Sequence, residues 1–302
     1  MKSVLTVIAP QDKEKLTNTL VQEIAANMVK AGATIISTDW LAPHIAYDII
    51  FSHMENSAAE HIARQTIGVL PIDCIAQDTF QRRKRMLISD MDSTIITIEC
   101  IDEIADFAGV KTQVAAITER TMRGEIDFIA ALSERVALLK GLEENVLQKV
   151  YDNRVKFMPG ARELVATMRA NGAYTILVSG GFDFFTSRVQ AELGFHDNSA
   201  NQLEIAGHKL TGQVLEPILD KQAKLATLIK VSNEKNISLA EVLAAGDGAN
   251  DLPMLIMAGL GVAYHAKPIV QQGARAKINH CDLTALLYAQ GYHYEEIVAK
   301  AG

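Results

Sequence analysis

Two acidic residues, Asp90 and Asp92, are the strongest candidates for catalytic groups in this sequence. They come directly after the apolar run 86–89, which has the composition of a buried strand. Side chains two residues apart on an extended segment point the same way, so both carboxylates can face one cavity. One of them can then attack a substrate while the other manages protons.

A turn or a calcium loop is the simpler interpretation of Asp90-x-Asp92. An EF-hand loop beginning at Asp90 would need glycine at position 95 and glutamate at position 101, where the chain has Ile95 and Ile101. We therefore exclude an EF-hand, while an ordinary Asp-rich turn stays open for this pair taken alone.

A second acidic cluster, Asp247, Asn250 and Asp251, follows another apolar run, 242–245. A dinucleotide-binding fingerprint would need glycine at position 251, which is Asp. Converging carboxylates repel one another unless a cation or a proton neutralises them. Because the clusters offer carboxylates and neither His nor Cys, the pattern favours Mg²⁺ over zinc.

A feature suited to phosphate lies between the clusters, where the apolar run 174–178 ends in Ser179-Gly-Gly. Glycines let backbone N–H groups approach an anion, and the amphipathic run 184–193 would place a helix N-terminus beside it. An ordinary strand-to-helix turn fits equally well. A phosphate also needs a cation, for which Lys221 and Lys224 are the candidates, although most lysines at such positions are solvated.

Strand ends at Asp90, Ser179 and Asp247 and a fourth apolar run at 260–264 are each followed by helical sequence. This alternation predicts an α/β fold with a doubly wound parallel sheet. The segment 203–215 predicts a hairpin that turns near Gly207 at the edge of the sheet.

The ordered motifs Asp90-x-Asp92, Ser179-Gly-Gly, a lysine and Gly246-Asp-Gly-x-Asn-Asp251 resemble those of the haloacid dehalogenase superfamily. Within it, residues 86–287 are similar to the phosphoserine phosphatase family. The matching stretches are 99–105, 135–140, 179–183 and 246–252. The resemblance implies a haloacid dehalogenase-like core at 86–99 and 156–302 and a helical cap at 100–155.

The resemblance also implies roles for the acidic residues. Asp90 would be the nucleophile that forms an aspartyl phosphate, and Asp92 the general acid and base. The cofactor would be Mg²⁺, bound by the carboxylates of Asp90 and Asp247 and by the backbone carbonyl of Asp92. Asp251 would orient a metal-bound water or the lysine, with a plain N-cap role as the alternative.

The phosphoryl oxygens would be bound by Ser179, the Gly180 N–H, Lys224 and Asn250. We choose Lys224 because the family pattern places its lysine after Ala, as in Ala223-Lys224, and Lys221 is the second choice. Preorganised donors of this kind usually supply the largest catalytic effect.

Substrate choice should reside in the cap. Phosphoserine carries an ammonium and a carboxylate beside its phosphate, so a selective pocket needs an acid and a base. The resemblance assigns Glu99 to the amino group and Arg135 to the carboxylate. A helix-start charge and a surface arginine are the alternative reading. Met122 and Phe128 resemble the apolar wall of the pocket, although residues at helical spacing are more often core.

The function implied is Mg²⁺-dependent hydrolysis of O-phospho-L-serine, the last step of serine biosynthesis. Another small phosphomonoester, such as phosphohomoserine or phosphothreonine, or transfer to an alcohol in place of water, stays open. From a different class, an amino-acid-sensing module on an inactive phosphatase would require a broken catalytic set, and every expected acid is present.

The first 80 residues lie outside that resemblance and predict the order βαββαβ. The expected elements are strand 3–9, helix 13–31, strand 34–41, strand 45–52, helix 58–67 and strand 68–75. This order resembles the ferredoxin-like ACT modules attached to enzymes of amino-acid metabolism. Serine binding at this domain and a homodimer are hypotheses, and a spacer that aids folding is equally compatible.

Composition limits the remaining classes. The 302 residues carry a net charge of −7, which argues against a nucleic-acid partner. The basic cluster 82–85 is expected to be a solvated linker between the domains. The three cysteines show neither disulfide nor zinc spacing. With no apolar stretch of about 18 residues and no signal-peptide pattern, we expect a cytoplasmic protein without a membrane segment.

Overall fold

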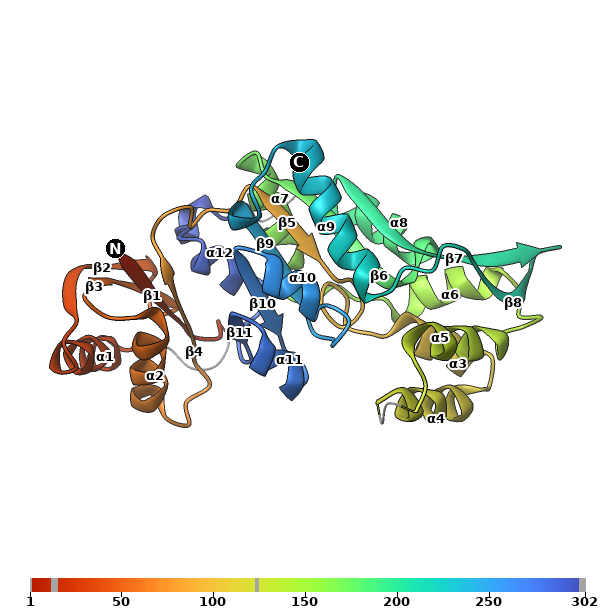
Figure 1. Cartoon of the computed structure of the whole chain (residues 1–302), viewed down its shortest axis with the longest axis horizontal. Helices are drawn as coiled ribbons and strands as arrows, with labels where there is room; N and C mark the ends of the chain where they lie inside the picture. The colour runs from red at the N-terminus through yellow and green to blue at the C-terminus, as the bar shows by residue number, and fades with distance from the viewer. Residues whose placement is uncertain (1, 12–15, 123–124, 299–302) are drawn as a thin grey trace.

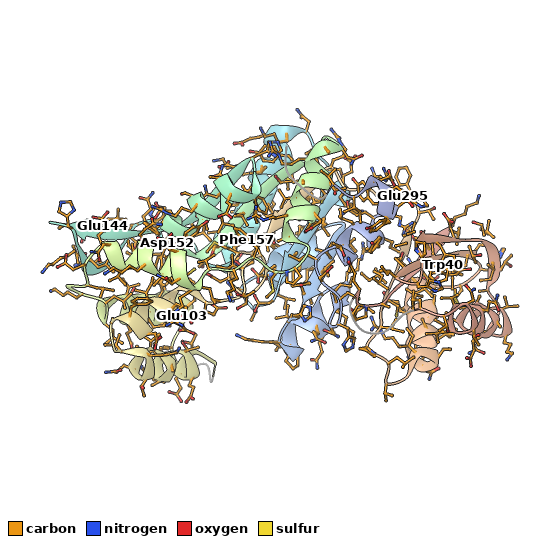
Figure 2. The ribbon with its side chains drawn as sticks, turned by 180° about the vertical axis from the view of Figure 1, so that it is seen from behind. Trp40, Glu103, Glu144, Asp152, Phe157 and Glu295 are labelled. Carbon is orange, nitrogen blue, oxygen red and sulfur yellow. The ribbon has the colours of Figure 1, made fainter. Side chains whose placement is uncertain are left out.

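The computed structural model describes residues 2–11, 16–122 and 125–298, which form an elongated body of three regions (Figure 1). A four-stranded sheet lies at one end, a seven-stranded sheet in the middle and a group of helices at the other end. Trp40 on the small sheet and Glu144 among the helices mark the two ends in Figure 2. No helix in the described ranges is both long and apolar enough to cross a membrane.

The N-terminal region is the predicted ferredoxin-like fold. Its sheet has the order β2-β3-β1-β4, every neighbouring pair is antiparallel, and both helices pack on one face. The elements are β1 (Ser3–Ile8), α1 (Asn18–Lys30), β2 (Thr34–Ala42), β3 (Ala46–Ser52), α2 (Asn56–Ile67) and β4 (Asp73–Asp78). The helix predicted from residue 13 begins at Asn18, and residues 12–15 lie outside the described ranges.

The prediction of a strand at 68–75 is wrong for its first five residues, because 68–72 form a turn. Gly68 has φ 63°, which ends α2, and Val69 is fully exposed. The apolar residues after Gly68 therefore do not continue into a strand, and β4 begins only at Asp73.

The prediction of a solvated linker at 82–85 is wrong for two of its residues. Arg82 donates to both oxygens of Asp48 and to the carbonyl of Ala289 (2.9 Å), and Lys84 is only 7% exposed. Asp73 lies at the same interface, where its carboxylate accepts the backbone N–H groups of 279–281, each at 2.9 Å. These buried contacts hold the N-terminal region against the central one.

The central sheet has the order β11-β10-β9-β5-β6-β7-β8, parallel except for the edge strand β8. The chain begins at β5, builds outward to one side and then returns to build outward from β9. The strands are β5 (Met86–Ser89), β6 (Tyr174–Phe182), β7 (Asp197–Ala206), β8 (Lys209–Leu215), β9 (Val242–Gly246), β10 (Leu260–Tyr264) and β11 (Ala276–Ile278). The doubly wound prediction is confirmed, and its topological switch point lies between β5 and β9.

Both faces of this sheet are buried, which is why its strands are apolar throughout. Along β5, Leu87 belongs to the core on one face, and Met86 and Ile88 belong to the core on the other. The helices of this region are α7 (Ala161–Ala170), α8 (Asp183–Leu193), α9 (Lys221–Lys235), α10 (Leu252–Met257), α11 (Pro268–Gly273) and α12 (Ala285–Ala289), with short 3₁₀ turns at Leu239–Glu241 and Tyr294–Glu296. The hairpin of β7 and β8 turns at Gly207 and His208, as predicted.

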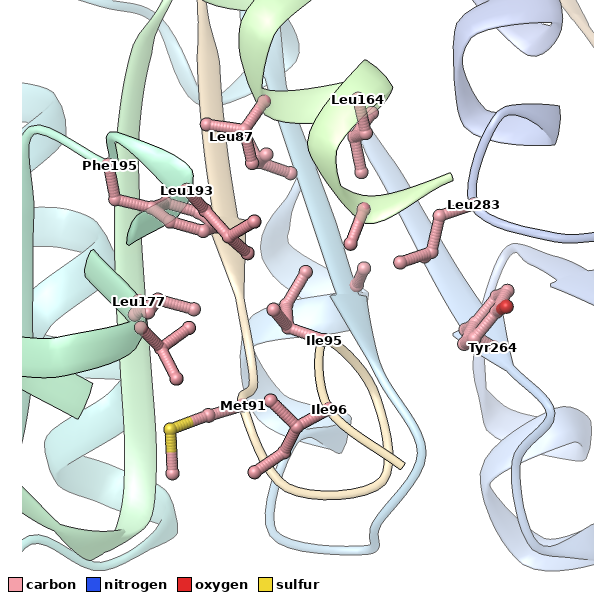
Figure 3. Packing of buried hydrophobic residues seen from close by; sticks show 14 of the residues in the cluster. Leu87, Met91, Ile95, Ile96, Leu164, Leu177, Leu193, Phe195, Tyr264 and Leu283 are labelled. Carbon is pink, nitrogen blue, oxygen red and sulfur yellow. The ribbon is translucent and has the colours of Figure 1, made fainter. Parts of the chain in front are cut away.

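The loop after β5 is anchored from below by three apolar side chains. Met91, Ile95 and Ile96 are each 0% exposed and turn into the core beneath the loop, as Figure 3 shows. Because neighbouring side chains in an extended segment point to opposite sides, burying Met91 directs Asp90 and Asp92 away from this core.

The helical cap consists of α3 (Cys100–Phe107), α4 (Lys111–Met122), α5 (Phe128–Ala137) and α6 (Asn145–Arg154). It joins the core through two short antiparallel segments, in which Ile96 pairs with Phe157 and Met158 N donates to Ile95 O at 2.9 Å. On its far side, Glu143 pairs with Lys209 of the β7–β8 hairpin. We propose the boundaries 86–99 and 156–302 for the core and 100–155 for the cap.

Candidate active site

Asp90 and Asp92 lie at the carboxyl end of β5, beside the switch point, and both are buried. The Asp90 N–H continues the parallel ladder by donating to Ala245 O at 3.0 Å. The Asp92 carboxylate is fixed at both oxygens, because Oδ1 accepts the Cys100 N–H (3.2 Å) and Oδ2 accepts the Ser179 hydroxyl (3.3 Å). Asp92 is therefore held between the first residue of the cap helix α3 and the end of β6.

The second acidic cluster meets the first across the switch point. Ligand atoms of Asp90, Asp247 and Asp251 all lie within 4.8 Å of one another. Lys224, on α9 and only 1% exposed, donates to Asp90 Oδ1 (2.8 Å) and to Asp251 Oδ1 (2.6 Å). Lys221 is exposed, so Lys224 is the lysine that α9 directs into the cluster.

Asp251 lies at the start of α10, but its side chain makes no N-cap hydrogen bond. It instead contacts Lys224 and accepts the Gly248 N–H at 3.0 Å. A Cβ atom on residue 246 would lie 2.5 Å from Cγ of Asp251, so the glycine of this motif makes room for the carboxylate. The cluster thus contains one more acid than the metal-ligand set expected from the sequence.

Burial and mutual repulsion raise the carboxyl pKa values in the cluster. The pKa of Asp92 is raised to about 7, first by burial and then by the charge of Glu99. The pKa of Asp247 is also raised to about 7, by burial and then by Asp251. Burial followed by the charge of Asp251 raises the pKa of Asp90 as well. Burial alone would lower the pKa of Lys224, but Asp251 and Asp90 outweigh it and raise the value. The cluster therefore holds excess negative charge that would be relieved by a cation.

The donor set fits Mg²⁺. It consists of carboxylate oxygens at the mouth of an α/β sheet, the type of ligand that this ion prefers. The ammonium of Lys224 is shared by Asp90 and Asp251, whereas the Asp247 carboxylate accepts a hydrogen bond from the Thr94 hydroxyl, at 3.3 Å. The excess charge therefore falls on Asp247, one of the two acids whose carboxylates the sequence assigned to the metal.

The segment 179–181 near the end of β6, which the sequence suggests for phosphate and which we call the phosphate loop, lies against these acids. The Ser179 hydroxyl accepts the Gly181 N–H at 2.9 Å while it donates to Asp92. A Cβ atom on residue 181 would lie 2.6 Å from Asp92 Oδ2, so only glycine permits this approach. A Cβ atom on Gly180 would lie 3.7 Å from Nδ2 of Asn250. The structure therefore brings Ser179, Gly180 and Asn250 to one place.

Of the four cap residues that the sequence assigns to the substrate pocket, Phe128 lies directly beside the phosphate loop. A Cβ atom on Gly180 would lie 3.1 Å from the Phe128 ring, so the first residue of α5 reaches the phosphate loop. Met122 ends α4, and its side chain falls outside the described ranges. The Arg135 guanidinium is half-buried and donates to Ala131 O at 3.2 Å, and among the described residues no carboxylate forms an ion pair with it. Glu99 accepts the Ser93 hydroxyl at 2.7 Å.

Sequence reasoning missed two hydroxyl residues that orient the acids. Ser93 positions Glu99, and Thr94 donates to Asp247 across the switch point. Ser93 adopts φ 55°, a conformation that is uncommon for a residue other than glycine. The motif Asp-x-Asp-Ser-Thr contained both residues, but no spacing rule linked them to partners 6 and 153 positions away.

The model of the haloacid dehalogenase-like hydrolase family matches residues 87–255, a range that includes all the candidate site residues and ends before β10 and β11. The chain belongs to this family. A phosphoserine phosphatase of Archaeoglobus fulgidus is 43% identical over 72% of this chain and 63% of its own length. A phosphoserine phosphatase of Streptomyces coelicolor is 37% identical over 99% of this chain and 72% of its own length. The resemblance read from the motifs is confirmed.

The likeness extends to the whole architecture. A haloacid dehalogenase family hydrolase from Salmonella enterica has a TM-score of 0.84 and 31% identity, with 95% of this chain and 98% of that one covered. The chain spans less than two thirds of the Archaeoglobus relative. The chain is therefore a member of a hydrolase family.

Proposed function

We propose that this enzyme hydrolyses O-phospho-L-serine to serine and phosphate. The observation that carries the proposal is the convergence of Asp90, Asp92 and Lys224 with Asp247 and Asp251 at the switch point of the sheet. The relatives described as phosphoserine phosphatases support the choice of substrate. Completion of serine biosynthesis would follow from this activity.

Asp90 is the nucleophile in this proposal. Lys224 holds Asp90 Oδ1 and favours the ionised carboxylate, which attacks the phosphorus of the substrate. The bond between phosphorus and the serine oxygen breaks, and an aspartyl phosphate forms on Asp90. A water molecule then attacks the phosphorus, releases phosphate and restores the carboxylate.

Asp92 handles the protons in both steps. Its raised pKa, about 7, leaves a proton available near neutral pH for the departing serine oxygen. The same carboxylate accepts a proton from the attacking water. The Cys100 N–H and the Ser179 hydroxyl keep it in one orientation throughout.

Asp90, Asp247 and the backbone carbonyl of Asp92 would hold Mg²⁺, with Asp251 adjoining them. When bound, the ion would supply positive charge that offsets repulsion between the phosphate and the carboxylates. Lys224, Ser179, the Gly180 N–H and Asn250 would bind the phosphoryl oxygens in this reading.

The cap would recognise the rest of the substrate. The half-buried Arg135 guanidinium donates to Ala131 O through Nε and forms no ion pair with a described residue, so its remaining planar donors suit a carboxylate. Glu99, oriented by Ser93, suits an ammonium. Phe128 would close the apolar side of the pocket, and the same role for Met122 stays a prediction from the sequence. Serine binding at the N-terminal domain, a homodimer and a cytoplasmic location remain predictions.

The test is phosphate release from O-phospho-L-serine, O-phosphothreonine and phosphohomoserine, with Mg²⁺ and with EDTA. We expect preference for O-phospho-L-serine, loss of turnover in EDTA, and loss of at least about 10⁴-fold in kcat for Asp90→Asn. Asp152→Asn on α6 is the control carboxylate, because Asp152 is exposed and, among the described residues, bonds only Gln148, and it should retain turnover. A faster rate on another ester would overturn the substrate, and full turnover of Asp90→Asn would overturn the nucleophile.

A further inference from the structure

Asn201 is a buried amide that no motif in the sequence identifies. It lies on β7, opposite Phe182 of β6, and is 1% exposed. Its Nδ2 donates to Gly180 O at 2.9 Å, and its Oδ1 accepts the Leu219 N–H at 2.6 Å. One side chain therefore bridges two loops that lie almost 40 residues apart in the chain.

The first of these loops is the phosphate loop. Asn201 holds the carbonyl of the peptide that joins Gly180 to Gly181, and the N–H of that same peptide donates to the Ser179 hydroxyl. Both polar groups of the peptide are thus fixed, which sets the orientation of the loop. The Ser179 hydroxyl in turn donates to Asp92, so the orientation of this peptide also affects the position of the Asp92 carboxylate.

The second loop leads into the helix that carries Lys224. Leu219 directly precedes Asp220, whose carboxylate caps α9 by accepting the N–H groups of Gln222 and Ala223, each at 2.9 Å. Lys224 follows in the first turn of that helix. Fixing Leu219 therefore fixes the point from which Lys224 extends toward Asp90.

From these contacts we infer that Asn201 is a positioning residue, which holds the phosphate loop and the start of the Lys224 helix at the separation that a phosphoryl group requires. It touches neither the substrate nor the reacting atoms. The inference rests on the proposed function, because it assumes that Ser179, Gly180 and Lys224 bind one phosphoryl group.

The chemistry of the side chain explains why an amide is needed. The bridge requires a donor toward Gly180 O and an acceptor toward Leu219 N within one short side chain, and a carboxamide offers both. Leucine has similar size but neither group. An ionised aspartate presents two acceptors and would repel the Gly180 carbonyl, whereas a protonated aspartate regains one donor.

The first experiment compares Asn201→Leu with wild type. A loop misplaced by about 1 Å can cost about 10²-fold in rate, so we expect kcat/KM to fall by about that factor. Competitive inhibition by inorganic phosphate should weaken by about tenfold, the effect of one lost hydrogen bond to a charged group. Asn198→Leu is the matched control, since Asn198 lies on the same strand but bonds Thr186 and Gln190 on α8.

The second experiment does not depend on the folding of the leucine variant. Burial raises the pKa of a carboxyl group, so Asn201→Asp should take up a proton as the pH falls. Its kcat/KM relative to wild type should therefore rise by about tenfold or more from pH 8 to pH 5.5. Asp and Asn have the same shape, so the substitution changes the hydrogen bonds and the charge but not the packing. If the bridge did not matter, the ratio of kcat/KM between Asn201→Asp and wild type would not change with pH.

Two results would overturn the inference: a pH-independent ratio for Asn201→Asp, or a lower melting temperature with unchanged kinetics and phosphate inhibition. Failure of the proposed function is a separate outcome. If wild type does not hydrolyse O-phospho-L-serine, the same ratios are measured with p-nitrophenyl phosphate and with calorimetry of inorganic phosphate binding, which test the positioning role without that substrate.

Discussion

Lys224→Met removes the ammonium group that contacts two buried acids. Lys224, Asp90 and Asp251 are 1%, 6% and 0% exposed, so water cannot replace the lost charge without opening the site. Methionine has nearly the length of the lysine side chain and should fill its space. The variant therefore isolates the loss of charge from a loss of packing.

The size of the effect follows from the two distances. Unit charges 2.8 and 2.6 Å apart attract each other by about 6 kcal/mol per pair at an effective dielectric constant of 20. Removing the ammonium from water costs several kcal/mol and offsets part of this attraction. Breaking a buried ion pair by removing one partner typically costs about 3–5 kcal/mol, which we expect here in EDTA at pH 7.5.

The assay is chemical unfolding with and without Mg²⁺, together with steady-state kinetics. The loss of unfolding free energy in Lys224→Met should be smaller at pH 5. Asp90, whose pKa is raised, takes up a proton there, and a neutral carboxyl group loses less when the ammonium is removed. We expect kcat/KM to fall by about 10²–10³-fold, the usual effect of losing one preorganised donor.

Lys221→Met is the matched control, since Lys221 lies three residues earlier on α9 and is exposed. Its unfolding free energy should stay within about 0.5 kcal/mol of wild type, as for most surface substitutions. If the Lys224 and Lys221 variants behaved alike in both assays, the buried cluster would not be the reacting centre.

Three further predictions concern the pocket, the acids and the domain interface. Arg135→Met should lower kcat/KM about 10²-fold for O-phospho-L-serine but less than about threefold for O-phosphoethanolamine, which lacks the carboxylate; equal losses would contradict the assigned role. In EDTA, the folded-state pKa of Asp247, about 7, exceeds its unfolded value of 3.8. Relative to Asp247→Asn, the unfolding free energy of wild type should therefore rise by about 1.4 kcal/mol as the pH falls from 8 to 6, and saturating Mg²⁺ should abolish this difference. Asp73→Asn should cost about 2–3 kcal/mol of unfolding free energy with unchanged kcat/KM; altered kinetics would favour a regulatory N-terminal domain.

The central region could be predicted from sequence because its strands are buried on both faces. Runs of apolar residues that end in Asp or Ser mark both a strand and its functional end, so β5 and β10 have the bounds that the sequence predicts. The switch point was not readable from any one strand, since it depends on the return of the chain to β9 beside β5. It is this return that brings Asp247 to Asp90.

The failures share a physical cause, which is contact between distant segments. Val69 and Leu70 look like the start of a strand, yet they form an exposed turn. Arg82 looks like a solvated charge, yet its side chain is only 13% exposed and forms an ion pair with Asp48. The choice between Lys221 and Lys224 needed the family pattern, because helix position alone does not determine which lysine faces a buried acid.

The cap and the acid chemistry are linked by one short segment. Glu99, the residue assigned to the substrate ammonium, directly precedes Cys100, whose N–H fixes Asp92. That N–H is at the N-terminus of α3, where unpaired donors favour a negative charge, while burial favours the proton on Asp92. Any movement of the cap about the pairing of Ile96 with Phe157 would shift the Cys100 N–H and so change the pKa of Asp92. Binding of the substrate ammonium at Glu99 would therefore also fix the cap residue that orients the acid for the bond to be broken.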